Sequence, residues 1–282
     1  MTVLILSLYI DITVKYHACI FSFFRHAFDS LCMEKCRMTK CALRLDAWIN
    51  RSRYIHSFRY NDLKRGNYMS VYYIPGCDVR RNHPEAVHKM ETWMNEHGIL
   101  PAACCRKDLS FLKENDLLVE NCTLCELMLR ERVPDTPFVS LYEYLDEMDF
   151  LWPDWHGKAL CLQDCRRTVN NVSLQNAVRS VLHKMNIEII EMNENREKSR
   201  YCGVWYNNPP APDCVKLALV TFAKLENERI LLTADEQKEK MREWVKQYQT
   251  DEIAVYCNGC ERGIRLGGGH PVHLIELITR DL

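Results

Sequence analysis

The sequence predicts an α/β protein made of two related half-domains, each with a small, largely parallel sheet. From Met69 onwards, short runs rich in β-branched and aromatic residues alternate with longer segments of helical periodicity. The alternation restarts after an irregular connector, residues 149–157. One order of cysteines occurs in each half: a single Cys, then Cys-Cys or Cys-Gly, then Cys-x-x-Cys. We therefore expect half-domains at residues 69–150 and 151–282.

In the first half, apolar runs are expected to form strands and periodic segments to form helices. Pro84 suits the first turn of a helix and Gly98 suits its end. The expected strands are Ser70–Pro75, Ile99–Cys105, Asp116–Glu120 and Phe138–Ser140, and the expected helices are 84–98, Glu126–Arg132 and a segment ending at Met148.

The second half repeats this alternation. Glu236 and Lys240, four residues apart, support a helix in their segment. The expected strands are Lys158–Gln163, Ile187–Ile190 and Glu252–Tyr256, and the expected helices are Ser173–Met185, Asp213–Asn227, Ala234–Gln249 and Pro271–Ile278.

Residues 1–68 differ from the rest of the chain. Asp11 and Lys15 interrupt their apolar runs, and the start lacks the basic segment and small-residue cleavage site of a signal peptide. Lys64-Arg-Gly66 can be encoded by a purine-rich ribosome-binding site just ahead of a start codon at Met69. Residues 1–68 are thus either a translated leader or a genuine extension, and the sequence predicts no inserted membrane segment.

Charge and cysteine usage limit the class of function. The 282 residues carry a net charge of -1, which gives no general attraction for nucleic acid or an anionic membrane. A chain of this length can bury a core without disulfides, so its 15 cysteines favour metal binding in a reducing compartment. We expect a cytoplasmic protein with thiolate ligands.

The cysteines fall at the ends of expected strands, where α/β folds place their sites. Both zinc and iron-sulfur clusters accept cysteine ligands. The tight Cys-x-x-Cys-x-x-Cys run of many cubane clusters is absent, so each site is expected to be assembled from several loops. The first cysteine set is Cys77, Cys104, Cys105, Cys122 and Cys125, and the second cysteine set is Cys165, Cys202, Cys257 and Cys260.

From Met69 to Leu282 the chain resembles the duplicated cysteine-rich (CCG) domain found in the B-type subunit of heterodisulfide reductase and in the iron-sulfur subunits of anaerobic glycerol-3-phosphate, lactate and glycolate oxidoreductases. Residues 1–68 have no counterpart in that family. The matching motifs are Ile74-Pro-Gly-Cys77, Cys104-Cys105, Asn121-Cys122-Thr-Leu-Cys125, Leu162-Gln-Asp-Cys165-Arg-Arg, Tyr201-Cys202-Gly203, Cys257-Asn-Gly-Cys260 and His270-Pro-Val-His-Leu-Ile-Glu-Leu277.

The resemblance implies an iron-sulfur redox subunit of anaerobic metabolism. It implies a 4Fe-4S cluster, of the non-cubane kind, at the first cysteine set. Such a subunit passes electrons between a flavoprotein or ferredoxin-type iron-sulfur partner and an acceptor, which in this family can be a disulfide. Gly267-Gly-Gly269 lacks the features of a phosphate-binding loop, so nucleotide and flavin binding are expected of the partner.

The chain departs from the family at two positions. Tyr201 stands where the first cysteine of the second pair belongs, and Arg106 replaces the glycine of the first motif. The second cysteine set is therefore expected to hold a 4Fe-4S cluster, to hold zinc or to be empty. A zinc-stabilised scaffold or binding module is the alternative function. A third hypothesis is a metal-free thiol-disulfide oxidoreductase using Cys122 and Cys125.

Further residues near the motifs have structural or tuning roles as alternatives. Cys161 and Cys214 match no motif position and are expected to be buried thiols. His270 and His273 either cap and pack the last helix or tune a centre near Cys260.

Overall fold

The computed structural model describes residues 70–203, 212–227 and 230–282. The chain divides into two units, Met1–Asp62 and Leu63–Leu282, and every described residue belongs to the second unit. The interpretation of residues 1–68 as a leader therefore lies outside the described residues.

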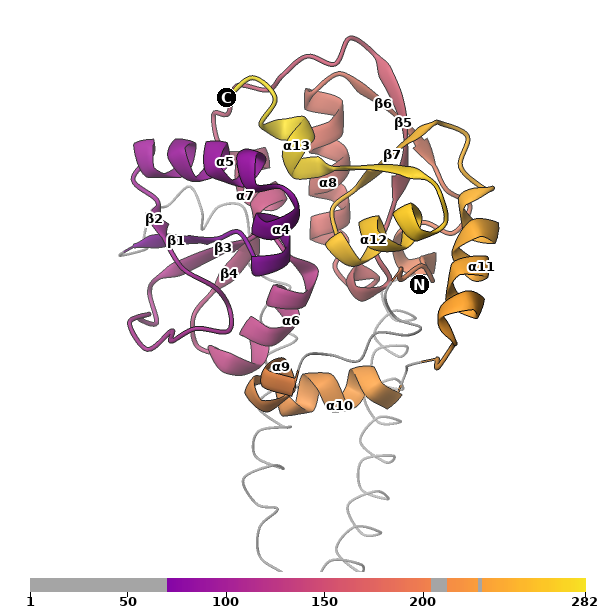
Figure 1. Cartoon of the computed structure of the whole chain (residues 1–282). Helices are drawn as coiled ribbons and strands as arrows, with labels where there is room; N and C mark the ends of the chain where they lie inside the picture. The colour runs from indigo at the N-terminus through magenta and orange to yellow at the C-terminus, as the bar shows by residue number, and fades with distance from the viewer. Residues whose placement is uncertain (1–69, 204–211, 228–229) are drawn as a thin grey trace, which may run out of the picture. The chain divides into compact units, whose positions relative to one another are not determined.

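In the described residues, two four-stranded sheets are present and all strand pairings are parallel (Figure 1). The first sheet has the order β2-β1-β3-β4, and the second has the order β6-β5-β7-β8. The predicted α/β class with two small parallel sheets is confirmed. The strands are β1 (Val71–Ile74), β2 (Leu100–Pro101), β3 (Leu117–Glu120), β4 (Phe138–Ser140), β5 (Lys158–Gln163), β6 (Ile187–Glu191), β7 (Glu252–Val255) and β8 (His270–His273).

Helices connect the strands, and side-chain caps fix where several of them begin. Ser140 and Glu143 form a capping box at the start of one helix, and Thr233 and Glu236 form another. The helices are α4 (Cys77–Asn82), α5 (Pro84–Glu96), α6 (Thr123–Arg132), α7 (Leu141–Glu147), α8 (Val172–Lys184), α9 (Pro212–Leu217), α10 (Leu219–Asn227), α11 (Ala234–Val245), α12 (Asn258–Leu266) and α13 (Leu274–Ile278), with 3-10 turns η1 (Arg166–Thr168) and η2 (Arg196–Lys198).

The expectation of a single helix over residues 271–278 is wrong. Residues 270–273 form β8, whose His273 pairs with Val255 of β7, and only α13 is helical. Pro271 is compatible with a strand here because β8 lies at the edge of its sheet.

Several other elements also differ from the expected ones. Helices α4 and α12 were not expected, and they begin directly after the strand ends that carry Cys77 and Cys257. The stretch 213–227 is two helices with the buried Ala218 between them. The second strand is shorter than expected and covers Leu100–Pro101.

Two glycine backbones meet where α12 packs against the Cys202-Gly203 segment. A Cβ atom added to Gly263 on α12 would lie 2.2 Å from the Cα of Gly203 and 2.6 Å from the hydroxyl oxygen of Tyr201. Gly263 is therefore required by close packing, and it leaves the space that the Tyr201 side chain fills.

We predict that G263A lowers the free energy of unfolding by about 3 kcal/mol or more, because backbone atoms cannot move away from the new methyl group. G98A is the matched control: Gly98 has φ 76° and open space around it, so alanine adds only backbone strain of about 1–2 kcal/mol. Urea denaturation of both variants measures the difference. Equal destabilisation would contradict this packing.

A buried histidine between α4 and α5 of the first half contacts helices of the second half. The Nε2 atom of His83 lies 2.9 Å from a carboxylate oxygen of Glu261 on α12, and its Nδ1 lies 3.0 Å from Glu276 on α13. Its ring packs on His273, with the ring centroids 4.8 Å apart. Burial lowers the pKa of His83, but the two carboxylates outweigh burial and raise it to about 9. His83 is thus a charged link at neutral pH.

We predict that this link weakens as the pH rises from 6.5 through 9. The folded state holds the His83 proton more tightly than the unfolded state, so the contribution is complete below about pH 6.5 and lost above the raised pKa. Its full size is about 3 kcal/mol. His273 does not titrate in this window, since burial and then the charge of His83 lower its pKa to about 4.

The measurement is the unfolding free energy of wild type and H83Q at intervals between pH 6 and 10. Other groups that titrate in this window, including the thiols, are shared by both proteins and cancel in the difference. The difference between the two proteins should shrink with rising pH. A constant difference would show that His83 acts by packing alone.

Candidate metal centre

The strand order places loops of each cysteine set at the carboxyl ends of two neighbouring strands. In the order β2-β1-β3-β4, the chain leaves β1 and β3 in opposite directions, so the carboxyl ends of these neighbours form a switch point. Cys77 follows β1 and Cys122 follows β3. Cys165 and Cys257 stand in the same relation to β5 and β7 of the second sheet.

Gly76 allows the first loop to approach the second. It has φ 82°, a backbone conformation that favours glycine. A Cβ atom at this position would lie 2.8 Å from the Cβ of Cys122 and 3.7 Å from the Sγ atoms of Cys122 and Cys125. A larger residue would thus separate Cys77 from the Cys-x-x-Cys loop.

Both Cys-x-x-Cys loops begin a helix. Cys122 is the N-cap residue of α6 and Cys257 is the N-cap residue of α12, each with an extended backbone. The partial positive charge and free N–H groups at a helix start favour thiolate. The backbone N–H of Cys122 itself donates to a carboxylate oxygen of Glu120 at 2.6 Å, which anchors the loop to the end of β3.

The Cys104-Cys105 loop is held by α6. The guanidinium of Arg132 donates to the carbonyl of Cys105 and, at 3.0 Å, to that of Lys107. The backbone N–H of Arg106 lies 3.5 Å from the Sγ of Cys104. Arg106 thereby adds a positive charge beside Cys104, and its pairing with that sulfur raises the pKa of the guanidinium.

The structure brings all members of the first cysteine set together as a continuous row of sulfurs. Cys77 contacts Cys104, Cys104 contacts Cys105, and Cys125 contacts both Cys105 and Cys122. The Sγ atoms of Cys105 and Cys125 are 3.1 Å apart. All of these cysteines are free thiols.

The pKa values of two members of this row, Cys104 and Cys122, are lowered, and those of the other three are raised. Hydrogen bonds from Cys105 and Cys77 lower the pKa of Cys104, and a hydrogen bond from Cys125 lowers that of Cys122. The three donor thiols have raised pKa values, since each loses its hydrogen bond to a neighbouring sulfur when it ionises. Two negative charges are thus favoured within one row.

In the second cysteine set, Cys165, Cys257 and Cys260 form a buried triad. Their Sγ atoms all lie within 4.8 Å of one another. Hydrogen bonds from Cys165 and Cys260 hold the pKa of Cys257 well below its usual range. Cys202 is buried near the triad but lies outside it. The structure therefore unites three of the four expected residues and leaves the fourth alongside.

Two residues beside the triad shape its surroundings. Thiolate charge at the second cysteine set raises the pKa of Arg167 against the effect of burial, so its guanidinium is a nearby counter-charge. Tyr201 donates from its hydroxyl to the carbonyl of Cys260 at 3.3 Å, and its ring packs on Trp244 with centroids 5.0 Å apart. Tyr201 packs beside the triad and offers it no sulfur.

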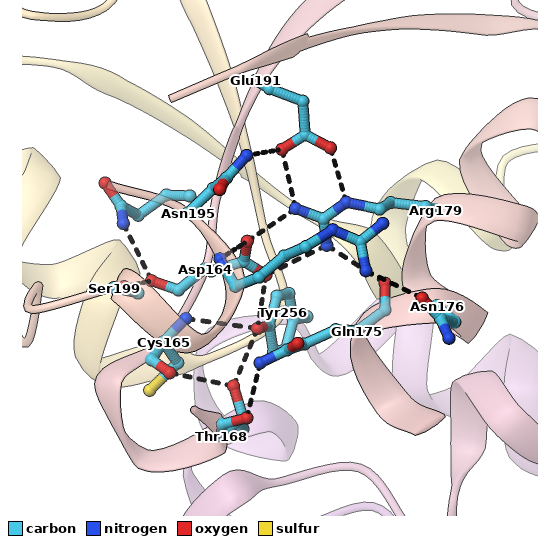
Figure 2. A network of polar contacts seen from close by, with 12 residues as sticks. Asp164, Cys165, Thr168, Gln175, Asn176, Arg179, Glu191, Asn195, Ser199 and Tyr256 are labelled. Carbon is cyan, nitrogen blue, oxygen red and sulfur yellow. Dashed lines mark hydrogen bonds and ion pairs between the residues drawn. The ribbon is translucent and has the colours of Figure 1, made fainter. Parts of the chain in front are cut away.

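A buried polar network fixes the loop that carries Cys165 (Figure 2). Arg179 donates to both carboxylate oxygens of Asp164, at 3.2 and 2.6 Å. The hydroxyl of Tyr256 donates to Asp164 at 2.9 Å and accepts from the backbone N–H of Cys165 at 3.2 Å. Because Tyr256 directly precedes Cys257, the network ties the two sulfur-bearing loops to each other.

We predict that Y256F lowers the free energy of unfolding by about 1–3 kcal/mol, because it leaves the buried N–H of Cys165 and a carboxylate oxygen of Asp164 short of a partner. It should also weaken zinc binding by the second cysteine set. Calorimetry and zinc titration measure the two effects.

Y142F is the control. Tyr142 is buried and its ring meets that of Tyr256 edge-on, with centroids 6.3 Å apart. Its hydroxyl has no hydrogen-bond partner among the described residues, so removing it should cost little. A Y256F protein that behaves like Y142F would show that the network does not hold the loop.

The donor atoms fit a thiophilic metal. Zinc binds sulfur at about 2.3 Å, which places tetrahedral ligands about 3.8 Å apart, and the triad fits this with small movements. The residues of the second cysteine set could therefore hold a metal ion. The row of the first cysteine set is longer: in the described part of the chain, only the triad forms a compact group of three.

Residues outside the motifs also lie at the first cysteine set. Cys214 on α9 packs in the same apolar cluster as Cys104, Cys105 and Cys125. It was expected only as a buried thiol, and no local spacing marks it, because its proximity arises from the docking of α9 and α10 on the first half. The N–H groups of Val220 and Thr221 donate to Glu131 on α6 in that contact.

The remaining expectations concern single residues. Cys161 is fully buried on β5 and its Sγ accepts the N–H of Gln249 at 3.2 Å. The Nδ1 atom of His273 accepts the N–H of Ile275 at 3.3 Å and so caps α13, whereas His270 is exposed and pairs with Asp251.

No protein-family model, curated protein or solved structure matches the chain. Among the residues described, no helix has both the length and the apolar character needed to cross a bilayer.

Proposed function

We propose that the protein is an iron-sulfur redox subunit that transfers electrons between a flavoprotein or ferredoxin-type partner and an acceptor, with a disulfide as the candidate acceptor. The observation that supports this most is the row of sulfurs at the first cysteine set, whose members come from three separate loops. Among the described residues, no three of these sulfurs form a compact single-ion group, and a linked row of this kind suits a cluster with several iron atoms.

The duplicated arrangement also favours this proposal. The two sheets share one strand order, and each carries a Cys-x-x-Cys loop between its third strand and the following helix. The family resemblance would assign a 4Fe-4S cluster, of the non-cubane kind, to the first cysteine set. When bound, such a cluster accepts and releases single electrons.

The chain's own residues would tune that centre. Arg106 places positive charge beside Cys104, and the helix start of α6 directs N–H groups at Cys122. Both stabilise electron-rich sulfur and favour the reduced state. The apolar cluster around Cys105 and Cys125, which includes Met128 and Phe222, keeps water from this end of the row.

A zinc-stabilised scaffold is the second candidate, and a specific observation favours it. The triad of Cys165, Cys257 and Cys260 has the spacing of a single-ion site, and Tyr201 supplies no ligand where the family has a cysteine. On this proposal the second cysteine set holds zinc and stabilises the fold.

Protein purified without oxygen is expected to be brown and to contain several iron and sulfide ions per chain. C125S should lose iron and the corresponding paramagnetic resonance signal, because Cys125 contacts sulfurs on both sides of it. C161S is the matched control, since Cys161 is equally buried but lies outside both cysteine sets. Zinc without acid-labile sulfide would select the scaffold, and a protein with neither metal would overturn both proposals.

A further inference from the structure

The first Cys-x-x-Cys loop reaches into the second cysteine set. Thr123, the residue after Cys122, donates from its hydroxyl to the Sγ of Cys257 at 3.3 Å. Both residues are about 95% buried, and they come from the two different halves, each of which contains one sheet. A threonine within one cysteine loop therefore touches a sulfur of the other.

The second loop makes a reciprocal contact. Asn258, the residue after Cys257, accepts on its Oδ1 from the Nδ2 of Asn82 at 3.2 Å. Asn82 ends α4, the helix that begins at Cys77. In each loop, the residue that follows the first cysteine therefore contacts the other half of the protein. Both loops make this kind of contact.

We propose that Thr123 is a positioning residue for the metal ligand Cys257, so that the first cysteine loop sets metal affinity at the second cysteine set. The inference deepens the proposed function, and it rests on metal binding by the second cysteine set but not on which metal is native.

The chemistry of the contact supports this role. A hydroxyl carries one proton, and giving it to Cys257 leaves the sulfur as acceptor, which is the state of a thiolate or of a metal-bound sulfur. A charge-assisted hydrogen bond is stronger than a neutral one. The hydrogen bond also orients the sulfur of Cys257. Its remaining lone pairs then point toward Cys165 and Cys260, the other members of the triad.

The position of Thr123 couples the two cysteine sets. Thr123 is the first residue of α6, so any displacement of Cys122 or of the start of this helix moves its hydroxyl relative to Cys257. A hydrogen bond to a ligand sulfur also alters the potential of a redox centre. A structural change at the first cysteine set would therefore alter metal binding at the second cysteine set through the Thr123 hydroxyl.

The test is a zinc titration of the full-length metal-free protein, with brief alkylation at each zinc concentration and mass spectrometry of the cysteine peptides. The zinc concentration that half-protects each peptide then reports each cysteine set separately. In T123V, which keeps the shape of the side chain, half-protection of Cys257 and Cys260 should require about tenfold more zinc. Half-protection of Cys105 should change by less than about twofold.

T123S keeps the hydroxyl and should restore the wild-type value at Cys257. An unchanged Cys257 midpoint in T123V would overturn the proposal. Equal shifts in T123V and T123S would also overturn it, because the methyl group and not the hydroxyl would then matter. A parallel shift at both cysteine sets would indicate general loss of structure and count against it as well. Iron and sulfide content, measured on separate anaerobic samples, tests the proposed function independently of these outcomes.

Discussion

Sulfur atoms held side by side inside a protein cannot all carry negative charge unless a cation neutralises them. Cys105 and Cys125 have their Sγ atoms 3.1 Å apart in an apolar cluster, and neither forms a disulfide. Without metal, hydrogen bonds between thiols and thiolates limit the charge of such a row. Arg106 and Arg167 each add one positive charge, fewer than the thiols present. A bound metal centre satisfies this constraint, because every thiol can then ionise.

The fold supplies the geometry that a metal centre needs, because it brings cysteines from separate loops together. Parallel strands end at one edge, and the order shared by both sheets places the end of one loop-bearing strand beside the next. Cys122 and Cys257 then stand at helix starts, where the partial positive charge favours thiolate. Buried networks such as that of Asp164, Arg179 and Tyr256 hold the loops in place.

Local pattern was sufficient for much of the fold, and it singled out the three cysteines that form the buried triad. The strands at 71–74, 117–120 and 158–163 are short apolar runs, and periodicity and capping residues identify α5 and α8. The sequence predicts a helix where the edge strand β8 lies, because Pro271 and the apolar residues after it also suit a helix start.

What local pattern could not supply depends on contacts between distant segments. The need for Gly263 arises from Gly203, sixty residues earlier in the chain, and the role of Thr123 arises from Cys257. Cys214 reaches the first cysteine set only because α10 docks on α6. Such contacts arise from tertiary packing, and neither the spacing of residues in the sequence nor their type predicts them.

Anomalous diffraction from crystals grown without oxygen, with data on both sides of the iron and zinc absorption edges, tests the central claim most directly. The account predicts an iron peak bonded to the sulfurs of Cys77, Cys104, Cys105, Cys122 and Cys125. The contradicting result is the absence of any metal peak at these sulfurs, with Cys105 and Cys125 joined as a disulfide.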